Sequence, residues 1–166
     1  MLRLASVGSG SKGNATLVCS GETTLLVDCG FGAREMLARL VELDVDAADI
    51  DAILVTHEHS DHIGGVTAIS KATGAPIYAT HGSIVSGKLE SARRVVEIAS
   101  DSTFAIGDID VTAVTVPHDA REPVQYIFQH ADKRVGVLTD LGTVSEPVLR
   151  ASSGCDRLML EFTHDV

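Results

Sequence analysis

The stretch His57-Glu58-His59-Ser60-Asp61-His62 brings three imidazoles and two carboxylates into six consecutive residues. It comes just after Ile53-Leu54-Val55, a short apolar run that is typical of a buried strand. Imidazole and carboxylate groups together suit zinc, and also manganese or iron. A polar surface loop rarely gathers ligand-type side chains at such close spacing. We therefore interpret the stretch as a metal-binding loop at the end of a strand.

The spacing within this stretch divides its side chains into two groups. Residues i and i+2 of an extended chain point the same way, so we expect His57 and His59 to bind one ion. If a helix begins next, Asp61 and His62 project from its start towards a neighbouring ion. Glu58 points away from both histidines, and we expect it to have a structural role. The metalloprotease pattern HExxH does not fit, because it requires a histidine at position 61.

The composition favours a globular chain with an acidic surface. It has 166 residues, 45% of them hydrophobic, which is enough for one domain with a core. Acidic residues outnumber basic ones by 23 to 13, and the net charge of −10 disfavours non-specific binding to phosphate backbones. A pair of bound divalent cations would still make one pocket positive, so a nucleic-acid substrate stays open.

The chain carries no pattern that predicts export or membrane insertion. We find no apolar run long enough to span a bilayer and no signal peptide at the first residues. The three cysteines have no CxxC spacing, which fits a reducing compartment better than a disulfide framework. We expect a cytoplasmic protein with no membrane contact, and the sequence leaves its oligomeric state open.

Short apolar runs separated by turn residues dominate the rest of the chain. They predict strands over residues 2–7, 15–19, 23–27, 53–55, 76–79, 103–106, 109–116, 124–128, 135–138 and 158–162. Helical spacing predicts helices over residues 36–43, 64–73, 83–99 and 144–150. Many short strands with few helices predict a single domain over residues 1–166, in which two sheets pack face to face with helices outside.

With these features in place, the chain resembles the metallo-β-lactamase fold. The pattern HxHxDH after an apolar strand is the motif most specific to that fold. Weaker motifs in the same order resemble the YycJ/WalJ branch of exonuclease-like metallo-hydrolases: Gly8-Ser9-Gly10-Ser11-Lys12-Gly13-Asn14, Leu26-Val27-Asp28-Cys29-Gly30, Val116-Pro117-His118-Asp119-Ala120 and Thr139-Asp140-Leu141-Gly142. The resemblance implies an α/β fold, an αββα sandwich of two mainly antiparallel sheets with outer helices.

The resemblance also implies a ligand set for two divalent ions, Zn²⁺ or Mn²⁺. His57, His59 and His118 correspond to the ligands of the first metal. Asp61 and His62 correspond to ligands of the second, and Asp140 to the carboxylate that bridges both.

Further residues correspond to supporting positions of the family. Asp28 resembles its buried aspartate, which supports the metal loop by hydrogen bonds without binding a metal. Asn14, in a loop near the site rim, is a candidate for substrate contact. Asp61 and His164 are candidates for protonating the leaving group, with Glu161 in a supporting position beside His164.

One departure from the family concerns the last histidine of the second metal site. In the family it lies on a late strand, beyond the position where this sequence stops. Residues 158–166 resemble the strand before it, so we expect a C-terminal strand and a helix to be missing. This expectation leaves open whether the second metal site is complete.

The activity implied is metal-dependent hydrolysis of phosphodiesters, with DNA as the substrate. Two ions would share a bridging hydroxide that attacks phosphorus, so the protein need not supply its own nucleophile. One alternative keeps the chemistry but changes the substrate to a thioester, a lactone or a β-lactam-like molecule. Another is a metal-binding fragment without catalysis.

Overall fold

A computed structural model describes residues 1–10, 12–116, 119–141 and 146–162, without the side chains of residues 140, 141, 161 and 162. Strands β1 to β6 form one sheet in chain order, with the bounds β1 Arg3–Gly8, β2 Ala15–Cys19, β3 Thr24–Val27, β4 Ala52–Leu54, β5 Ile77–Thr80 and β6 Val95–Ile98. The first three strands pair antiparallel, and β3 to β6 pair parallel.

The second sheet has the strand order β11-β10-β9-β8-β7. Its strands are β7 Thr103–Ile106, β8 Ile109–Thr115, β9 Val124–His130, β10 Lys133–Leu141 and β11 Arg157–Phe162. Pairing is antiparallel from β7 to β10, and β11 joins β10 in parallel. The helices are α1 Ala33–Glu42, α2 Ser60–Ile63, α3 Val66–Thr73, α4 His81–Val85 and α5 Glu146–Ser152, with a 3₁₀ turn at Ala47–Asp49.

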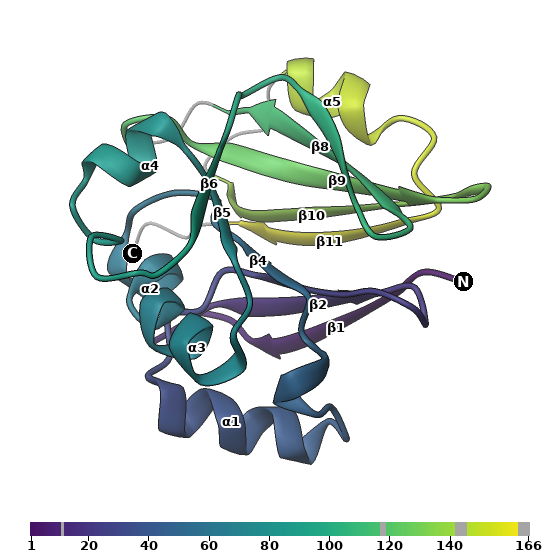
Figure 1. The fold of residues 1–166 in the computed structure, drawn as a ribbon. Helices are drawn as coiled ribbons and strands as arrows, with labels where there is room; N and C mark the ends of the chain where they lie inside the picture. The colour runs from purple at the N-terminus through teal and green to yellow at the C-terminus, as the bar shows by residue number, and fades with distance from the viewer. Residues whose placement is uncertain (11, 117–118, 142–145, 163–166) are drawn as a thin grey trace.

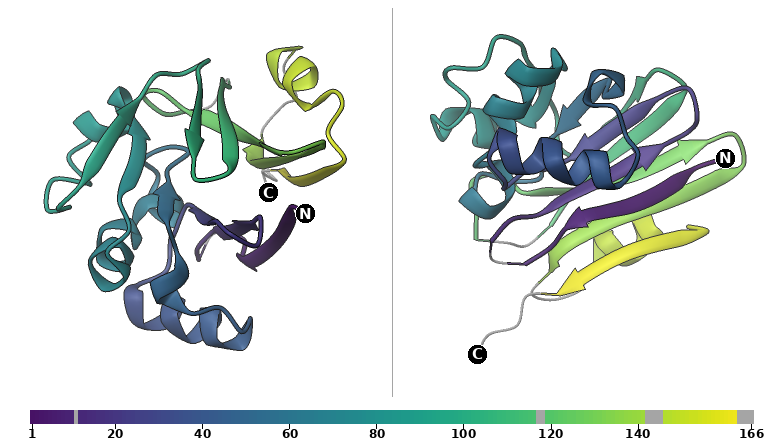
Figure 2. Two further views of the ribbon diagram at one scale, coloured as in Figure 1. Left: turned by 45° about the vertical axis from the view of Figure 1, so that its right-hand side comes forward. Right: turned by 90° about the horizontal axis from the view of Figure 1, so that it is seen from below.

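These elements form the four layers that the resemblance implied (Figures 1 and 2). The first sheet differs from the expected mainly antiparallel pairing, because three of its five strand pairs are parallel. One apolar cluster lies between the sheets, where Leu25 and Leu54 pack with Tyr126 and Phe128. A second cluster joins the opposite face of the first sheet to α1 and α3, and a third packs α5 on the outside of the second sheet. Because the first sheet is covered on both faces, its central strands are almost continuously apolar.

The prediction of a helix over residues 83–99 is wrong. The helix α4 ends at Val85, and Val95–Ile98 forms β6, which extends the parallel sheet beside β5. Gly87, with a φ of 85°, has the left-handed conformation that breaks helices. The β-branched residues Val95, Val96 and Ile98 suit the pleated surface of a strand better than a helix.

Candidate metal centre

The predicted metal loop lies at the carboxyl end of β4, where Thr56 and His57 lead into α2. The ring centroids of His57 and His59 lie 4.7 Å apart, and those of His57 and His62 lie 4.2 Å apart. His57 and His62 are each 1% exposed, whereas His59 is half-buried. The three imidazoles therefore form one cluster, with His59 as its most accessible member.

Asp28 follows β3, next to β4 in the sheet, and its carboxylate holds this cluster together. Its Oδ1 accepts the backbone N–H of Thr56 at 2.8 Å, and its Oδ2 accepts the Thr56 hydroxyl at 2.6 Å. The same Oδ2 lies 2.7 Å from Nδ1 of His62. Asp28 is 2% exposed and has a φ of 61°, a left-handed backbone that aspartate tolerates better than most residues.

These contacts assign the protons of two imidazole rings. A carboxylate only accepts hydrogen bonds, so His62 donates its Nδ1–H to Asp28, and the Thr56 hydroxyl also donates to Asp28. The Thr56 oxygen then accepts the Nδ1–H of His57, at 2.8 Å. Both rings therefore carry a proton on Nδ1, and in a neutral ring the lone pair is then on Nε2. This tautomer is the one in which Nε2 binds a metal, with the other nitrogen held by an oxygen.

Asp61, at the start of α2, lies between Asn14 and His62. Its Oδ2 accepts the side-chain amide of Asn14 at 3.1 Å and is 3.6 Å from Nε2 of His62. The Asp61 side chain is 30% exposed, so it remains open to solvent beside two buried histidines. Asn14 itself is 5% exposed, and its predicted contact with substrate stays a prediction.

Glycines let two backbone segments meet beneath the cluster. A Cβ at Gly65 would lie 1.6 Å from the carbonyl oxygen of Phe31, and one at Gly30 would lie 2.0 Å from that of Asp61. Hydrogen bonds from Cys29 N to His62 O and from Gly65 N to Cys29 O join the same segments. The turn after Asp28 is thereby held against the turn that carries Asp61 and His62.

The second sheet brings the carboxyl end of β10 towards this site. The backbone N–H of Val124 donates to the Thr56 carbonyl at 3.0 Å. The side chain of Gln125, next along β9, makes hydrogen bonds to both the N–H and the carbonyl of Thr139. Thr139 directly precedes Asp140, whose side chain lies outside the described residues. Position 140 thus lies on β10, the neighbour of the strand whose first residue is hydrogen-bonded to Thr56.

Arg121, three positions after the predicted ligand His118, is hydrogen-bonded to the metal loop. His118 itself lies outside the described residues, and the N–H of Arg121 donates to Oε1 of Glu58 at 2.9 Å. The carbonyl of Glu58 accepts the ammonium of Lys88 at 2.6 Å. Glu58 thus joins the metal loop to Arg121 through its side chain and to Lys88 through its backbone. His164 and the side chain of Glu161 also lie outside the described residues.

The donor set fits a divalent metal. His57 and His62 have the required tautomer, His59 lies beside them, and Asp61 adds a carboxylate, a combination that suits zinc or manganese. Among the residues that the structure describes, no group of three or more His, Cys, Asp or Glu is placed to hold a metal ion. The predicted set also counts on His118 and Asp140.

Thr56 is the residue of this site that the sequence reasoning missed. Its hydroxyl links Asp28 to His57, and its side chain is fully buried. A signal was present, because a hydroxyl residue stands between the last apolar residue of the strand and the first histidine. Only the fold, however, shows that Asp28 lies opposite it.

Burial changes the ionisation of two groups near the site. It raises the pKa of the Cys29 thiol to about 12, and the thiol donates a hydrogen bond to the Phe31 carbonyl at 3.2 Å. Burial also raises the pKa of Tyr126 well above its ordinary value, and its hydroxyl donates to the Val55 carbonyl at 2.6 Å. Both groups stay neutral near pH 7, and neither is suited to act as a nucleophile.

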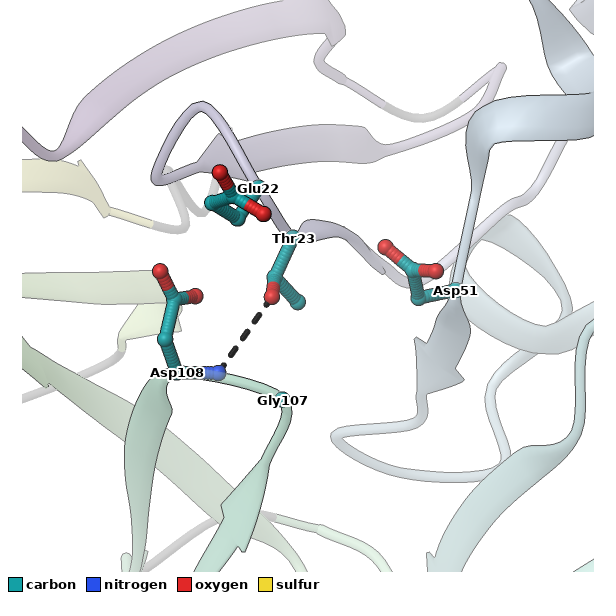
Figure 3. Close-up of a pocket in the computed structure, with 5 residues that line it drawn as sticks. All are labelled: Glu22, Thr23, Asp51, Gly107 and Asp108. Carbon is teal, nitrogen blue, oxygen red and sulfur yellow. Dashed lines mark hydrogen bonds between the residues drawn. The ribbon is translucent and has the colours of Figure 1, made fainter.

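A second group of carboxylates lies at the amino ends of β3 and β4. Glu22, Asp51 and Asp108 surround Thr23 and Gly107 in an open cavity of about 550 Å³ (Figure 3). All three carboxylates come from turns or strand starts, and hydrogen bonds from Ser20 and Thr23 lower the pKa of Asp108. No imidazole lines this cavity among the residues that the structure describes.

Comparison with known proteins decides the family. The family described as Beta-lactamase superfamily domain matches residues 23–165, which include the predicted metal loop. The chain belongs to the beta-lactamase superfamily. Within the described residues, none of the helices has both the length and the apolar character needed to cross a membrane.

Two curated relatives match most of the chain. The exodeoxyribonuclease WalJ of Streptococcus pneumoniae serotype 2 (strain D39) is 36% identical over 168 residues, covering 96% of this chain and 62% of the relative. The exodeoxyribonuclease YycJ of Bacillus anthracis is 32% identical over 171 residues, covering 99% of this chain and 64% of the relative. The chain thus spans slightly less than two thirds of the length of these relatives.

Solved structures confirm the fold. The metallo-β-lactamase SMB-1, bound to 2-mercaptoethanesulfonate, superimposes with a TM-score of 0.73 at 22% identity, over 93% of this chain and 75% of that one. At this identity the likeness shows the fold alone. The predicted metallo-β-lactamase sandwich is therefore confirmed.

Proposed function

We propose that this superfamily member is a metal-dependent exodeoxyribonuclease that hydrolyses phosphodiester bonds of DNA. The observation that carries the proposal is the imidazole cluster at the carboxyl ends of β3 and β4, held by the buried Asp28. The names of the two relatives, at 32% and 36% identity, favour DNA over the small-molecule substrates of the alternative reading.

The metal site of the proposal uses two divalent ions, Zn²⁺ or Mn²⁺. We assign His57, His59 and His118 to the first ion, Asp61 and His62 to the second, and Asp140 to both. When bound, such ions supply hydroxide near neutral pH and offset the negative charge that develops on a phosphate.

The residues of the chain have separate tasks in this scheme. Asp28 and Thr56 keep the protons of His62 and His57 on Nδ1, so that Nε2 can bind. Asp61, with its 30% exposed side chain, is the described residue that we propose to protonate the leaving group. His164, with Glu161 beside it, is the other candidate for this step.

Lys88 supports a nucleic-acid substrate in an otherwise acidic chain. Its side chain is exposed, and its ammonium lies 2.6 Å from the carbonyl of Glu58, between His57 and His59 in the sequence. A cation at this place can attract a phosphate of the DNA backbone.

We also propose that residues 1–166 form one domain and that the protein is cytoplasmic, where Cys19, Cys29 and Cys155 stay free thiols.

Hydrolysis of end-labelled DNA in the presence of Mn²⁺ or Zn²⁺ tests the proposal. We expect His59→Ala and Asp140→Ala each to abolish metal-dependent cleavage. His81→Ala is the matched control, because His81 is exposed and pairs with Glu97 outside the site. Retained cleavage in both ligand variants would refute the mechanism. Turnover of a thioester or β-lactam panel, with no cleavage of DNA, would favour the alternative substrate class.

A further inference from the structure

We infer that Asn14 is a positioning residue, which holds the Asp61 carboxylate in place for metal binding and does not contact substrate. The inference rests on the proposed function, because it assigns Asn14 a task within the proposed metal site. It is carried by the contacts of the Asn14 amide and by the burial of this side chain.

Both the nitrogen and the oxygen of the Asn14 side-chain amide make hydrogen bonds within the protein. Its Nδ2 donates to Oδ2 of Asp61 at 3.1 Å, to the Asp61 carbonyl at 3.2 Å and to the Gly10 carbonyl at 2.9 Å. Its Oδ1 accepts the N–H of Gly10 at 3.2 Å. A flipped amide would place its oxygen against three acceptors, so these contacts fix its orientation.

The backbone around Asn14 makes the side chain a rigid support. The Asn14 N–H donates to the Asp61 carbonyl at 2.8 Å, and the Asn14 carbonyl accepts the N–H of Gly30 at 3.1 Å. The residue is therefore joined to the turn of Asp61 and to the turn after Asp28. Because the backbone bond to Asp61 does not need the Asn14 side chain, a side-chain substitution removes the contact with the carboxylate and leaves the backbone bond.

These observations argue against contact between Asn14 and substrate. The side chain is 5% exposed, whereas Asp61, which it supports, is 30% exposed. A substrate that reached the amide would have to displace Asp61 or the segment of Gly10. The position on a glycine-rich loop suggested a substrate residue, but the hydrogen bonds of the amide point to Asp61.

The test compares metal binding by Asn14→Ala and Asn14→Ser with that of the unsubstituted chain. Serine retains a hydroxyl for Gly10 but is too short to reach the Asp61 carboxylate, so it serves if the alanine variant folds poorly. Ser70→Ala is the matched control, because Ser70 lies in α3 and its hydroxyl donates a buried hydrogen bond to the carbonyl of Ala75, which follows that helix. Zn²⁺ titration against a chelator resolves the two equivalents, and DNA cleavage is measured at low and high Mn²⁺.

We expect the Asn14 variants to bind the weaker equivalent of Zn²⁺ about 10- to 100-fold less tightly, a range typical of lost contacts to metal ligands. The tighter equivalent and the KM for DNA should change less than about threefold, and excess Mn²⁺ should restore kcat. In an Asp61→Ala background, Asn14→Ala should have no further effect on metal binding, since the group it orients is gone.

Two results would overturn the inference while leaving the proposed function intact. The first is unchanged metal binding with a raised KM for DNA, which would make Asn14 a substrate contact. The second is an equal loss of both equivalents, matched by Ser70→Ala, which would mean general destabilisation. A wild-type chain that binds no second ion would contradict the proposed dinuclear site, and the inference with it.

Discussion

Strands β3 and β4 have an aspartate contact at each end. In both contacts the carboxylate accepts a threonine N–H, but the two aspartates differ in their burial and in their neighbours. At the carboxyl ends, Asp28 accepts the N–H of Thr56 at 2.8 Å. At the amino ends, Asp51 accepts the N–H of Thr24, also at 2.8 Å. Asp28 is 2% exposed and contacts an imidazole, whereas Asp51 is exposed and lines the open cavity of Figure 3.

The comparison shows that a cluster of carboxylates is not sufficient for a metal centre. At the amino ends of β3 and β4 the carboxylates are exposed to solvent, so little is gained by binding an ion there. At the carboxyl ends of the strands, the side chains are buried, so a polar atom without a hydrogen bond is costly there. The hydrogen bonds of His57 and His62 place a proton on Nδ1 of each ring. We therefore expect substitutions at the carboxyl end to change metal binding, and matched substitutions at the amino end to leave it unchanged.

Among the substitutions that compare the two ends of β3 and β4, the largest effect is expected for Asp28→Asn. The new amide group would donate where Oδ2 accepts, which would reverse the proton assignments of His62 and, through Thr56, of His57. We expect a loss of about 100-fold in metal affinity and in DNA cleavage, measured by titration and by end-labelled substrates. Asp51→Asn is the matched variant and should leave both values unchanged. An unchanged metal affinity in Asp28→Asn would contradict the claim that the buried Asp28 supports the metal site.

Thr56→Val should have a smaller effect. It removes the hydroxyl between Asp28 and His57 but leaves the contact between Asp28 and His62. We expect metal affinity to fall by about 10-fold, and Thr56→Ser to restore it. Thr23→Val, at the acidic end, is the control: its hydroxyl accepts the N–H of Asp108, and its loss should lower only the stability, by about 1 kcal/mol. Equal metal binding by both valine variants would contradict the claim that the Thr56 hydroxyl links Asp28 to His57.

Substitution of Lys88 tests whether DNA approaches the carboxyl ends of β3 and β4, beside the metal loop. Lys88→Ala should raise the KM for DNA several-fold at low salt, and the salt dependence of binding should weaken by about one counterion. Lys133→Ala is the matched control, since Lys133 is exposed and begins β10 at the end of the strand opposite Asp140. If both variants behave alike, the effect reflects net charge and not a DNA path beside the metal loop.

The smallest effect separates two cysteines at opposite ends of the first sheet. Burial raises the pKa of Cys29 to about 12, so its thiol should resist alkylation in the native protein at pH 8. Cys19, half-buried at the end of β2, should react under the same conditions. Mass spectrometry of the labelled peptides measures both. Rapid labelling of Cys29 would show that the turn after Asp28 opens readily.

The metal loop could be predicted because its motif is a local feature of the sequence, whereas the role of Asp28 was expected only from the resemblance to the metallo-β-lactamase fold. The sequence could not predict that Thr56 joins Asp28 to His57, since this contact depends on the pairing of β3 with β4. The contact of Asn14 with Asp61 spans 47 positions and has no local signal. The error over residues 83–99 has a different cause, because pairing with β5 selects a strand where the helical pattern was weak.

Elemental mass spectrometry of the purified chain tests the central claim most directly, namely that the carboxyl ends of β3 and β4 hold the metal. We predict two divalent ions per chain, a large loss in Asp28→Asn, and no change when Glu22, Asp51 and Asp108 are replaced together by their amides. A chain without bound ions would contradict the account. Ions that survive Asp28→Asn but disappear with the three acidic substitutions would place the metal at the opposite end.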